Sequence, residues 1–296
     1  MNSGNSLLSE KDKIKIKNLI SSRNLSEIIK ILEKVKTSHA NTAKTKDKRF
    51  VIREIVREII DSGKDTGKDY FQTGLFFCRR KEDNAKEIGI SLIWRGYKQN
   101  PGKVKEFLLK TADDQNWEVR EYAGSAFADT LFYNREFYKD LIEWTKHPTE
   151  NVRRAVVFSA LGMRDEKNLN KAFRILRSLM NDRSIYVRKN LGPFILGSYF
   201  GNKFPEETTA FLHNCLNDRD LYVRWNVIMS FNNSFGKKYP GKAFEILKYF
   251  YDDENLVVIR AMRSTLKFLR RHHRKVTDEF IKKYYKDKFN LAELNL

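Results

Sequence analysis

Hydrophobic and polar positions along the chain follow a pattern that repeats every 33 to 36 residues. Each repeat has a polar or acidic opener, then an apolar residue and an arginine, then apolar residues at helical spacing. Five segments share it: DDQNWEVREYAGSAFADTL, HPTENVRRAVVFSALGM, NDRSIYVRKNLGPFILGSY, NDRDLYVRWNVIMSFNNSF and DDENLVVIRAMRSTLKFL. Their shared arginines are Arg120, Arg153, Arg188, Arg224 and Arg260. Self-similarity at this period predicts a repeat architecture.

Each repeat is predicted to hold two antiparallel helices. The first carries a run such as REFYKDLIEWTKH or KAFRILRSLMND, and it ends at a polar break. The opener is expected to cap the second helix by accepting hydrogen bonds from free N–H groups in the first turn. Apolar residues of that helix, such as Val119, Ala123 and Phe127, recur at helical spacing. Stacked helix pairs form an all-α solenoid of HEAT-like repeats, for which we expect a concave basic groove.

The repeat pattern fades toward the N-terminus but does not disappear. Residues 81–100 are predicted to be the second helix of an earlier pair begun by YFQTGLFFCRR, and residues 47–62 another amphipathic helix. Residues 1–46 are polar and lysine-rich, with a helical section and a predicted linker, TSHANTAKTKD. The expected organisation is a basic helical N-terminal extension, 1–46, followed by one superhelical domain, 47–296.

Composition agrees with an all-α chain and indicates a polyanionic partner. Only 14 Gly and 5 Pro occur in 296 residues, while 41% of residues are hydrophobic. Few helix breakers and many helix formers favour helices. Lys and Arg number 57 against 38 Asp and Glu, a net charge of +19. Such an excess favours nucleic acid as partner. The alternative is a lysine-rich proteome or a charge that serves solubility alone.

Sequence motifs typical of nucleotide-binding and metal-dependent proteins are absent from this chain. There is no GxxxxGK[ST], no HExxH and no Cys/His cluster, so we expect neither a metal nor a nucleotide cofactor. Cys78 and Cys215 lie far apart in the chain, which fits a reducing compartment. No stretch of 18 consecutive apolar residues occurs, and the N-terminus lacks an apolar signal region. We therefore expect a cytoplasmic monomer without a membrane partner.

The residue after each shared arginine occupies one equivalent position in every repeat. These residues are Glu121, Arg154, Lys189, Trp225 and Ala261. If the second helices line the inner surface of the solenoid, they form a ladder along the groove. Four of the shared arginines, Arg120, Arg188, Arg224 and Arg260, are expected to tie neighbouring repeats together through acidic side chains or helix ends.

Trp117 and Glu121 distinguish the repeat that contains them. They are four residues apart, so both project from the same helical face, and no other repeat has an aromatic residue at the Trp117 position. Cations on adjoining rungs would hold phosphates, the indole would contact a base or sugar, and the carboxylate would stabilise a developing cation. The alternative is structural, with Trp117 packed between helices and Glu121 paired with Arg154.

The segments NWEVREYAG and ENVRRAVVFSAL resemble the HEAT-like-repeat alkylpurine DNA glycosylases of the AlkC and AlkD type. In that family a tryptophan is followed four residues later by a catalytic carboxylate, a spacing that Trp117 and Glu121 reproduce. The resemblance implies that Arg154 grips the DNA backbone. It covers roughly residues 47–286, and only the 113–160 portion is motif-like. One repeat on, where a second tryptophan is expected, the chain has Pro193; either Trp225, one rung later, takes over the aromatic role or no second aromatic is needed.

The resemblance implies excision of cationic N3- or N7-alkylated purines from double-stranded DNA without metal or cofactor. Glu121 would be the catalytic carboxylate and Trp117 would contact the base and sugar, while Arg154, Lys189 and Trp225 would contact DNA.

One further basic run stands near the C-terminal end of the last repeat. RRHHRK contributes Arg270, Arg271, Arg274 and Lys275, which either contact phosphates from a loop or remain solvated. Two other functions stay open. One is a non-catalytic HEAT-repeat protein that binds distorted or branched DNA, and the other is a scaffold for an acidic protein, which the net charge disfavours.

Overall fold

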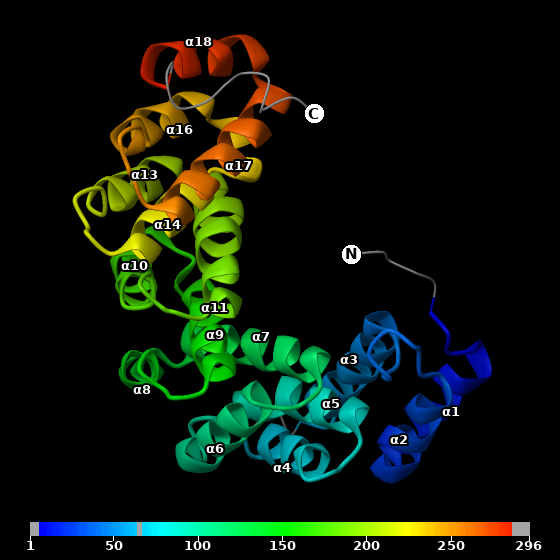
Figure 1. Cartoon of the computed structure of the whole chain (residues 1–296). Coiled ribbons are helices and arrows are strands. Elements are labelled where there is room, and N and C mark those ends of the chain that lie inside the picture. The colour runs from blue at the N-terminus through cyan, green and yellow to red at the C-terminus, as the bar shows by residue number, and fades with distance from the viewer. Residues whose placement is uncertain (1–5, 64–66, 286–296) are drawn as a thin grey trace. The chain divides into compact units, whose positions relative to one another are not determined.

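The protein is helical wherever its structure is described. The computed structural model describes residues 6–63 and 67–285 (Figure 1). Within these ranges the backbone forms helices and turns, with one isolated β-bridge between Lys36 and Ala43. The chain forms two compact units, residues 1–144 and 145–296. The prediction of an all-α protein is confirmed.

Unit 1 is built of packed helices, and residues between 8 and 92 share one hydrophobic core. Its helices are α1 (Glu10–Ser21), α2 (Leu25–Lys34), α3 (Thr45–Asp61), α4 (Gly67–Cys78), α5 (Asp83–Ile93), α6 (Pro101–Ala112), α7 (Trp117–Tyr133) and α8 (Tyr138–Trp144), with 3₁₀ turns at Trp94–Gly96 and Arg135–Phe137. The predicted pair upstream of the repeats is confirmed as α4 and α5. Helices α1 and α2 pack with α3 and α5, so the N-terminal segment shares this core.

Unit 2 is a stack of helix pairs in two layers (Figure 1). It contains α9 (Glu150–Ser159), α10 (Leu169–Arg177), α11 (Ile185–Asn190), α12 (Gly201–Lys203), α13 (Pro205–His213), α14 (Leu221–Met229), α15 (Ser234–Lys238), α16 (Pro240–Leu247), α17 (Leu256–His272) and α18 (Arg274–Tyr284), with a π-helical segment at Leu191–Phe200 and 3₁₀ turns at Ala160–Met163, Glu166–Asn168 and Lys248–Phe250. The π-helical segment continues α11 and packs on α14, which packs on α17. These are the second helices that the repeat pattern predicts.

The repeated arginine closes the opener loop of its own repeat. Nη1 of Arg120 donates to the backbone oxygens of Asp114 and Gln115, at 2.7 and 3.0 Å. Nη1 of Arg188 makes the same pair of bonds to Asp182 and Arg183. Arg153 and Arg224 repeat the arrangement. The arginine thus satisfies carbonyl groups at the turn that precedes each second helix.

The same arginine also joins neighbouring repeats in two places. Nε of Arg153 lies 2.6 Å from Oδ2 of Asp182, the opener of the next repeat, and Nε of Arg224 lies 2.7 Å from Oδ2 of Asp253. In unit 1 a lysine takes this part, because Nζ of Lys86 lies 2.9 Å from Oδ2 of Asp114. The tie between repeats expected for Arg224 is therefore confirmed, and Arg153 makes the same kind of contact.

The sequence pattern predicted that the opener caps the second helix, and this is wrong. The capping residue lies two residues after the opener. The side chains of Asn116, Ser184, Asp220 and Asn255 accept from the first-turn N–H groups. The opener aspartate accepts from the N–H of the capping residue instead, as Asp182 Oδ1 does from Ser184 at 2.8 Å. The opener therefore positions the capping residue and does not itself accept a hydrogen bond from the first turn of the helix.

Counting from the cap changes the register of the last repeat. The arginine is the fourth helical residue in α7, α9, α11 and α14, but α17 begins at Leu256 and has Ile259 in that position. Arg260 is the fifth residue, so it is not equivalent to the other arginines. The fifth-position ladder therefore ends in Arg260, which is exposed, and not in Ala261, which is buried.

Replacing Asp182 by alanine is expected to destabilise unit 2 by about 2–3 kcal/mol, because a buried carboxylate loses charge-assisted hydrogen bonds with Arg153 and Ser184. Urea unfolding measures the change. The control is Glu206→Ala, which removes an exposed ion pair between α13 and α16 and should change stability by less than about 1 kcal/mol. Equal effects of the two substitutions would contradict the role of the repeated clamp.

Candidate functional site

The N-terminus of α7 is fixed by polar contacts from two other segments. Asn116 caps the helix through Oδ1, which accepts from the N–H of Glu118 at 2.9 Å. Its Nδ2 donates to Oδ2 of Asp83 at 2.8 Å and to the backbone oxygen of Ala40 at 2.9 Å. Burial would raise the pKa of Asp83, but hydrogen bonds from Lys86 and Asn116 hold it below its ordinary value. The first turn of α7 is therefore held in place by an ionised carboxylate.

Trp117 is the first residue of this helix, and Glu121 follows one turn later. The Trp117 side chain is 40% exposed, so it is not buried between helices as the structural alternative requires. Glu121 is half-buried. Residues four apart on a helix are neighbours on one face. An exposed indole and a carboxylate thus lie side by side at the start of α7.

The adjacent face of α7 carries a buried ionic cluster. Lys48 of α3 and Glu87 of α5 are completely buried, and the Lys48 ammonium contacts the Glu87 carboxyl group. Nζ of Lys48 also lies 3.0 Å from Oε1 of Glu118, and Lys48 lies over the ring of Tyr122. Burial raises the pKa of Glu87 to about 8, and Glu118 adds to the rise while Lys48 opposes it. Nζ of Lys48 therefore contacts two carboxyl groups, of which the buried Glu87 keeps its proton near neutral pH.

This cluster joins α3 and α5 to the first turn of α7, the helix that carries Trp117 and Glu121. Lys48 belongs to α3, Glu87 to α5, and Glu118 stands between Trp117 and Glu121 on α7. An ion pair withdrawn from water is strong only when its geometry is maintained. The cluster therefore holds the first turn of α7 at one position relative to α3 and α5.

In unit 2 the structure separates the predicted DNA-contacting residues into exposed and enclosed ones. Lys189 is exposed, and Trp225 is half-buried with the guanidinium of Arg188 5.5 Å from its ring centre. Arg154 is only 4% exposed, because its guanidinium lies between the rings of Phe158 and Tyr186, 4.7 and 4.8 Å from their centres. Such an arginine presents little surface to a phosphate.

The repeat that lacks the second expected tryptophan has another aromatic residue beside Pro193. Phe194 is exposed, and its ring centre lies 5.9 Å from that of Phe158. Pro193 belongs to the π-helical segment, and its backbone oxygen accepts from Nδ2 of Asn233 at 2.7 Å. The sequence alone could have suggested Phe194 as the aromatic residue of this repeat, because it directly follows Pro193.

The basic run at residues 270–275 does not form a loop. Helix α17 continues to His272 and α18 begins at Arg274, so the run spans a junction of a single residue. Nε of Arg270 lies 2.6 Å from Oδ1 of Asp278, an ion pair within the end of the unit. Arg271, Arg274 and Lys275 are exposed.

A basic stripe on α3 was not among the residues predicted from sequence. Lys46, Arg49, Arg53 and Arg57 are all exposed, and their spacing of three and four residues places them on one helical face. Arg49 acts electrostatically on Tyr122 of α7, so the stripe begins near the first turns of α7. The signal was available, since KDKRFVIREIVREII alternates basic and apolar positions at helical spacing.

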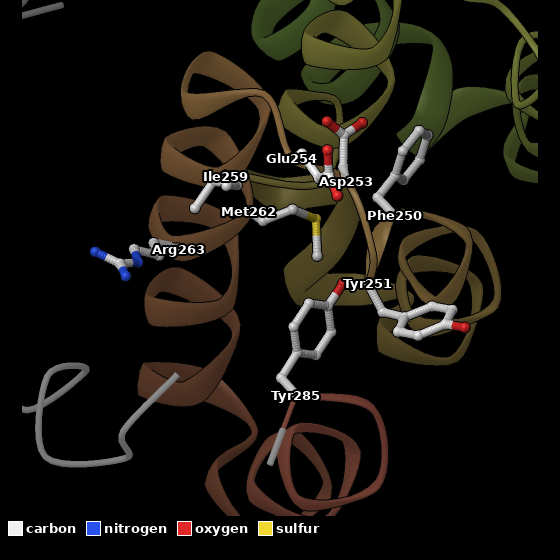
Figure 2. Close-up of a pocket in the computed structure, with 8 residues that line it drawn as sticks. All are labelled: Phe250, Tyr251, Asp253, Glu254, Ile259, Met262, Arg263 and Tyr285. Atoms are coloured by element: carbon white, nitrogen blue, oxygen red, sulfur yellow. The ribbon is translucent and has the colours of Figure 1, made fainter. Parts of the chain in front are cut away.

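Unit 2 also contains a cavity of about 380 Å³ beside α17. Figure 2 shows Tyr285 and Met262 reaching toward each other, with the carboxylates of Asp253 and Glu254 at the opposite end. Ile259, which replaces the repeated arginine, also lines this cavity. None of the predicted site residues does.

The described ranges, 6–63 and 67–285, contain no group of three or more His, Cys, Asp or Glu side chains placed to hold a metal ion. They also contain no helix whose length and apolar character would allow it to cross a bilayer.

Comparison with known proteins identifies the family. Residues 48–212 match the family described as DNA alkylation repair enzyme, which is more than half of the 296-residue chain. The chain belongs to this family. Membership of the DNA alkylation repair enzyme family supports a role in DNA alkylation repair, as an enzyme with DNA as its partner. The matched range includes Trp117, Glu121 and most of the α3 helix.

Solved structures add only distant similarity. The chain is similar to YibA of Escherichia coli, with 16% identity, a TM-score of 0.40, and 98% and 97% of the two chains covered. It is also similar to an engineered protein, with 12% identity, a TM-score of 0.30, and 88% and 99% covered. A search of curated protein sequences found no match.

Proposed function

We propose that this member of the DNA alkylation repair enzyme family is an alkylpurine DNA glycosylase. Its substrates would be cationic N3- or N7-alkylated purines, such as 3-methyladenine and 7-methylguanine, in duplex DNA. The observation that carries the proposal is the exposed Trp117 with Glu121 one turn later on the same face of α7. An aromatic face attracts a cationic base, and a carboxylate stabilises a cationic sugar.

The reaction needs little beyond these two groups. Alkylation puts a positive charge on the purine, so the base leaves with the electrons of the N-glycosidic bond as a neutral molecule. The sugar is left with oxocarbenium character, which an ionised Glu121 would stabilise across a short distance. Water then adds at C1′ and gives up a proton, for which the same carboxylate is an acceptor. The products are a free base and an abasic site.

Exposed cations supply the contacts to the DNA backbone in this proposal. They are Lys189, Arg260, Arg271, Arg274 and Lys275 in unit 2, and the α3 stripe in unit 1. Each phosphate contact releases counterions, so affinity should fall steeply with salt. Arg154 and Arg270 do not belong to this set, because two aromatic rings flank the guanidinium of Arg154 and Asp278 pairs with that of Arg270.

Release of methylated bases from methylated duplex DNA tests the proposal. We expect the purified protein to liberate 3-methyladenine or 7-methylguanine, detected by chromatography, and to leave abasic sites in equal amount. Salt-dependent binding of duplex DNA without any release would overturn the glycosylase and leave a non-catalytic DNA-binding protein. Absence of both would favour a scaffold for an acidic protein.

A further inference from the structure

A short hairpin of the N-terminal segment is fixed beside Trp117. Residues 36–43, predicted from sequence to belong to a linker, close through the bridge between Lys36 and Ala43 and a 2.8 Å bond from Thr37 N–H to the Thr42 oxygen. Asn41 turns the chain with φ 55°, in the left-handed region that asparagine tolerates. The segment is therefore a defined turn.

Helices α5 and α7 hold this hairpin from two sides. The N–H of Ala43 donates to Oδ1 of Asn84 at 2.8 Å, and the Thr42 hydroxyl donates to the carboxylate of Glu118. Nδ2 of Asn116 donates to the backbone oxygen of Ala40. Thr42 and Ala43 are buried, whereas the tip, which carries His39, is at the surface. The anchors are backbone groups and other side chains, so they do not require His39.

The tip places the imidazole of His39 against the indole of Trp117. The ring centres are 5.1 Å apart and the planes meet at 79°. Both side chains are exposed. Two exposed rings at nearly a right angle form a corner, in which a flat base can stack on one ring and meet the other at its edge.

We propose that His39 is a positioning residue for the alkylated nucleotide, which it contacts together with Trp117. This inference rests on the proposed glycosylase function and names the lesion-contacting surface of that same site. The imidazole limits the orientations of a base that contacts the indole, and Glu121 stands one turn further along α7. The aromatic ring, rather than a hydrogen bond of the imidazole, is the part that acts.

Substitutions at His39 test this role with methylated and undamaged duplexes of one sequence. In single-turnover release, His39→Ala and His39→Asn should be slower by about tenfold, in the range that loss of one stacking contact produces. His39→Phe keeps a ring and should retain most of the rate. Ser38→Ala, at an exposed neighbour on the same hairpin, should behave as wild type. Thermal midpoints and affinity for undamaged DNA should not change in any of them.

Tryptophan fluorescence tests the contact between His39, Trp117 and the lesion independently of base release. The protein has four tryptophans, so the Trp117 signal is the difference between wild type and Trp117→Phe. Methylated but not undamaged duplex should change this signal, and His39→Ala should remove the change. Base release with a wild-type rate and signal in His39→Ala overturns the inference while the glycosylase stands. If wild type releases no base, the glycosylase proposal fails. The lesion contact then stands if methylated duplex changes the Trp117 emission only when His39 is present, and it is overturned if His39→Ala leaves that change intact.

Discussion

Replacing Glu121 by glutamine is expected to lower the single-turnover rate of base release by about 100-fold or more, the size of effect seen when one transition-state-stabilising group is removed. Glutamine keeps the shape of the side chain but carries no charge, so it cannot stabilise an oxocarbenium-like sugar or accept a proton from water. Affinity for methylated duplex should stay the same or rise slightly, because a negative charge is removed. The rate and the affinity are measured on the same methylated duplex.

The matched control is Glu106→Gln, which removes an exposed carboxylate from α6 in the same unit. It should release base at the wild-type rate. A Glu121→Gln protein as fast as wild type would remove Glu121 from the chemistry. A folded Glu121→Gln protein that binds DNA but releases no base would separate catalysis from recognition.

Replacing Lys48 by methionine is expected to destabilise unit 1 by about 3–5 kcal/mol at pH 9, where Glu87 is ionised, because the buried Glu87 and the half-buried Glu118 then lose their cation. Base release should fall as well, since the same cluster holds the first turn of α7. Urea unfolding gives the stability change. The double variant Lys48→Met/Glu87→Leu should recover part of it, because it removes one uncompensated carboxyl group. No recovery would mean that Lys48 acts through packing rather than charge.

The raised pKa of Glu87 also sets the sign of a pH dependence. The folded protein keeps this proton up to about pH 8, whereas the unfolded chain releases it near the ordinary value of 4.5. The stability that this group contributes is therefore complete at low pH and is lost as pH rises through that interval. The loss caused by Lys48→Met should consequently be larger at pH 9 than at pH 6.

The repeat architecture was predictable because its signals are local. Helical periodicity, the opener and the arginine all act within about ten residues, so Arg224 could be assigned a structural role before its partner, Asp253, was known. The pairing of Trp117 with Glu121 on one face follows from helix geometry alone. The register of the last repeat was mispredicted because it was counted from Arg260, whereas the Asn255 cap sets where α17 begins.

By itself the sequence determined the all-α class, the repeat period, the second helices and the one repeat with a tryptophan and a carboxylate on the same face. Only the tertiary structure decided which of these groups meet solvent. It left Trp117 exposed beside His39, enclosed Arg154 between Phe158 and Tyr186, and buried Lys48 with Glu87. The physical reason is that helix formation depends on neighbours along the chain, whereas burial and pKa depend on segments up to 78 residues apart that pack together, as His39 and Trp117 do.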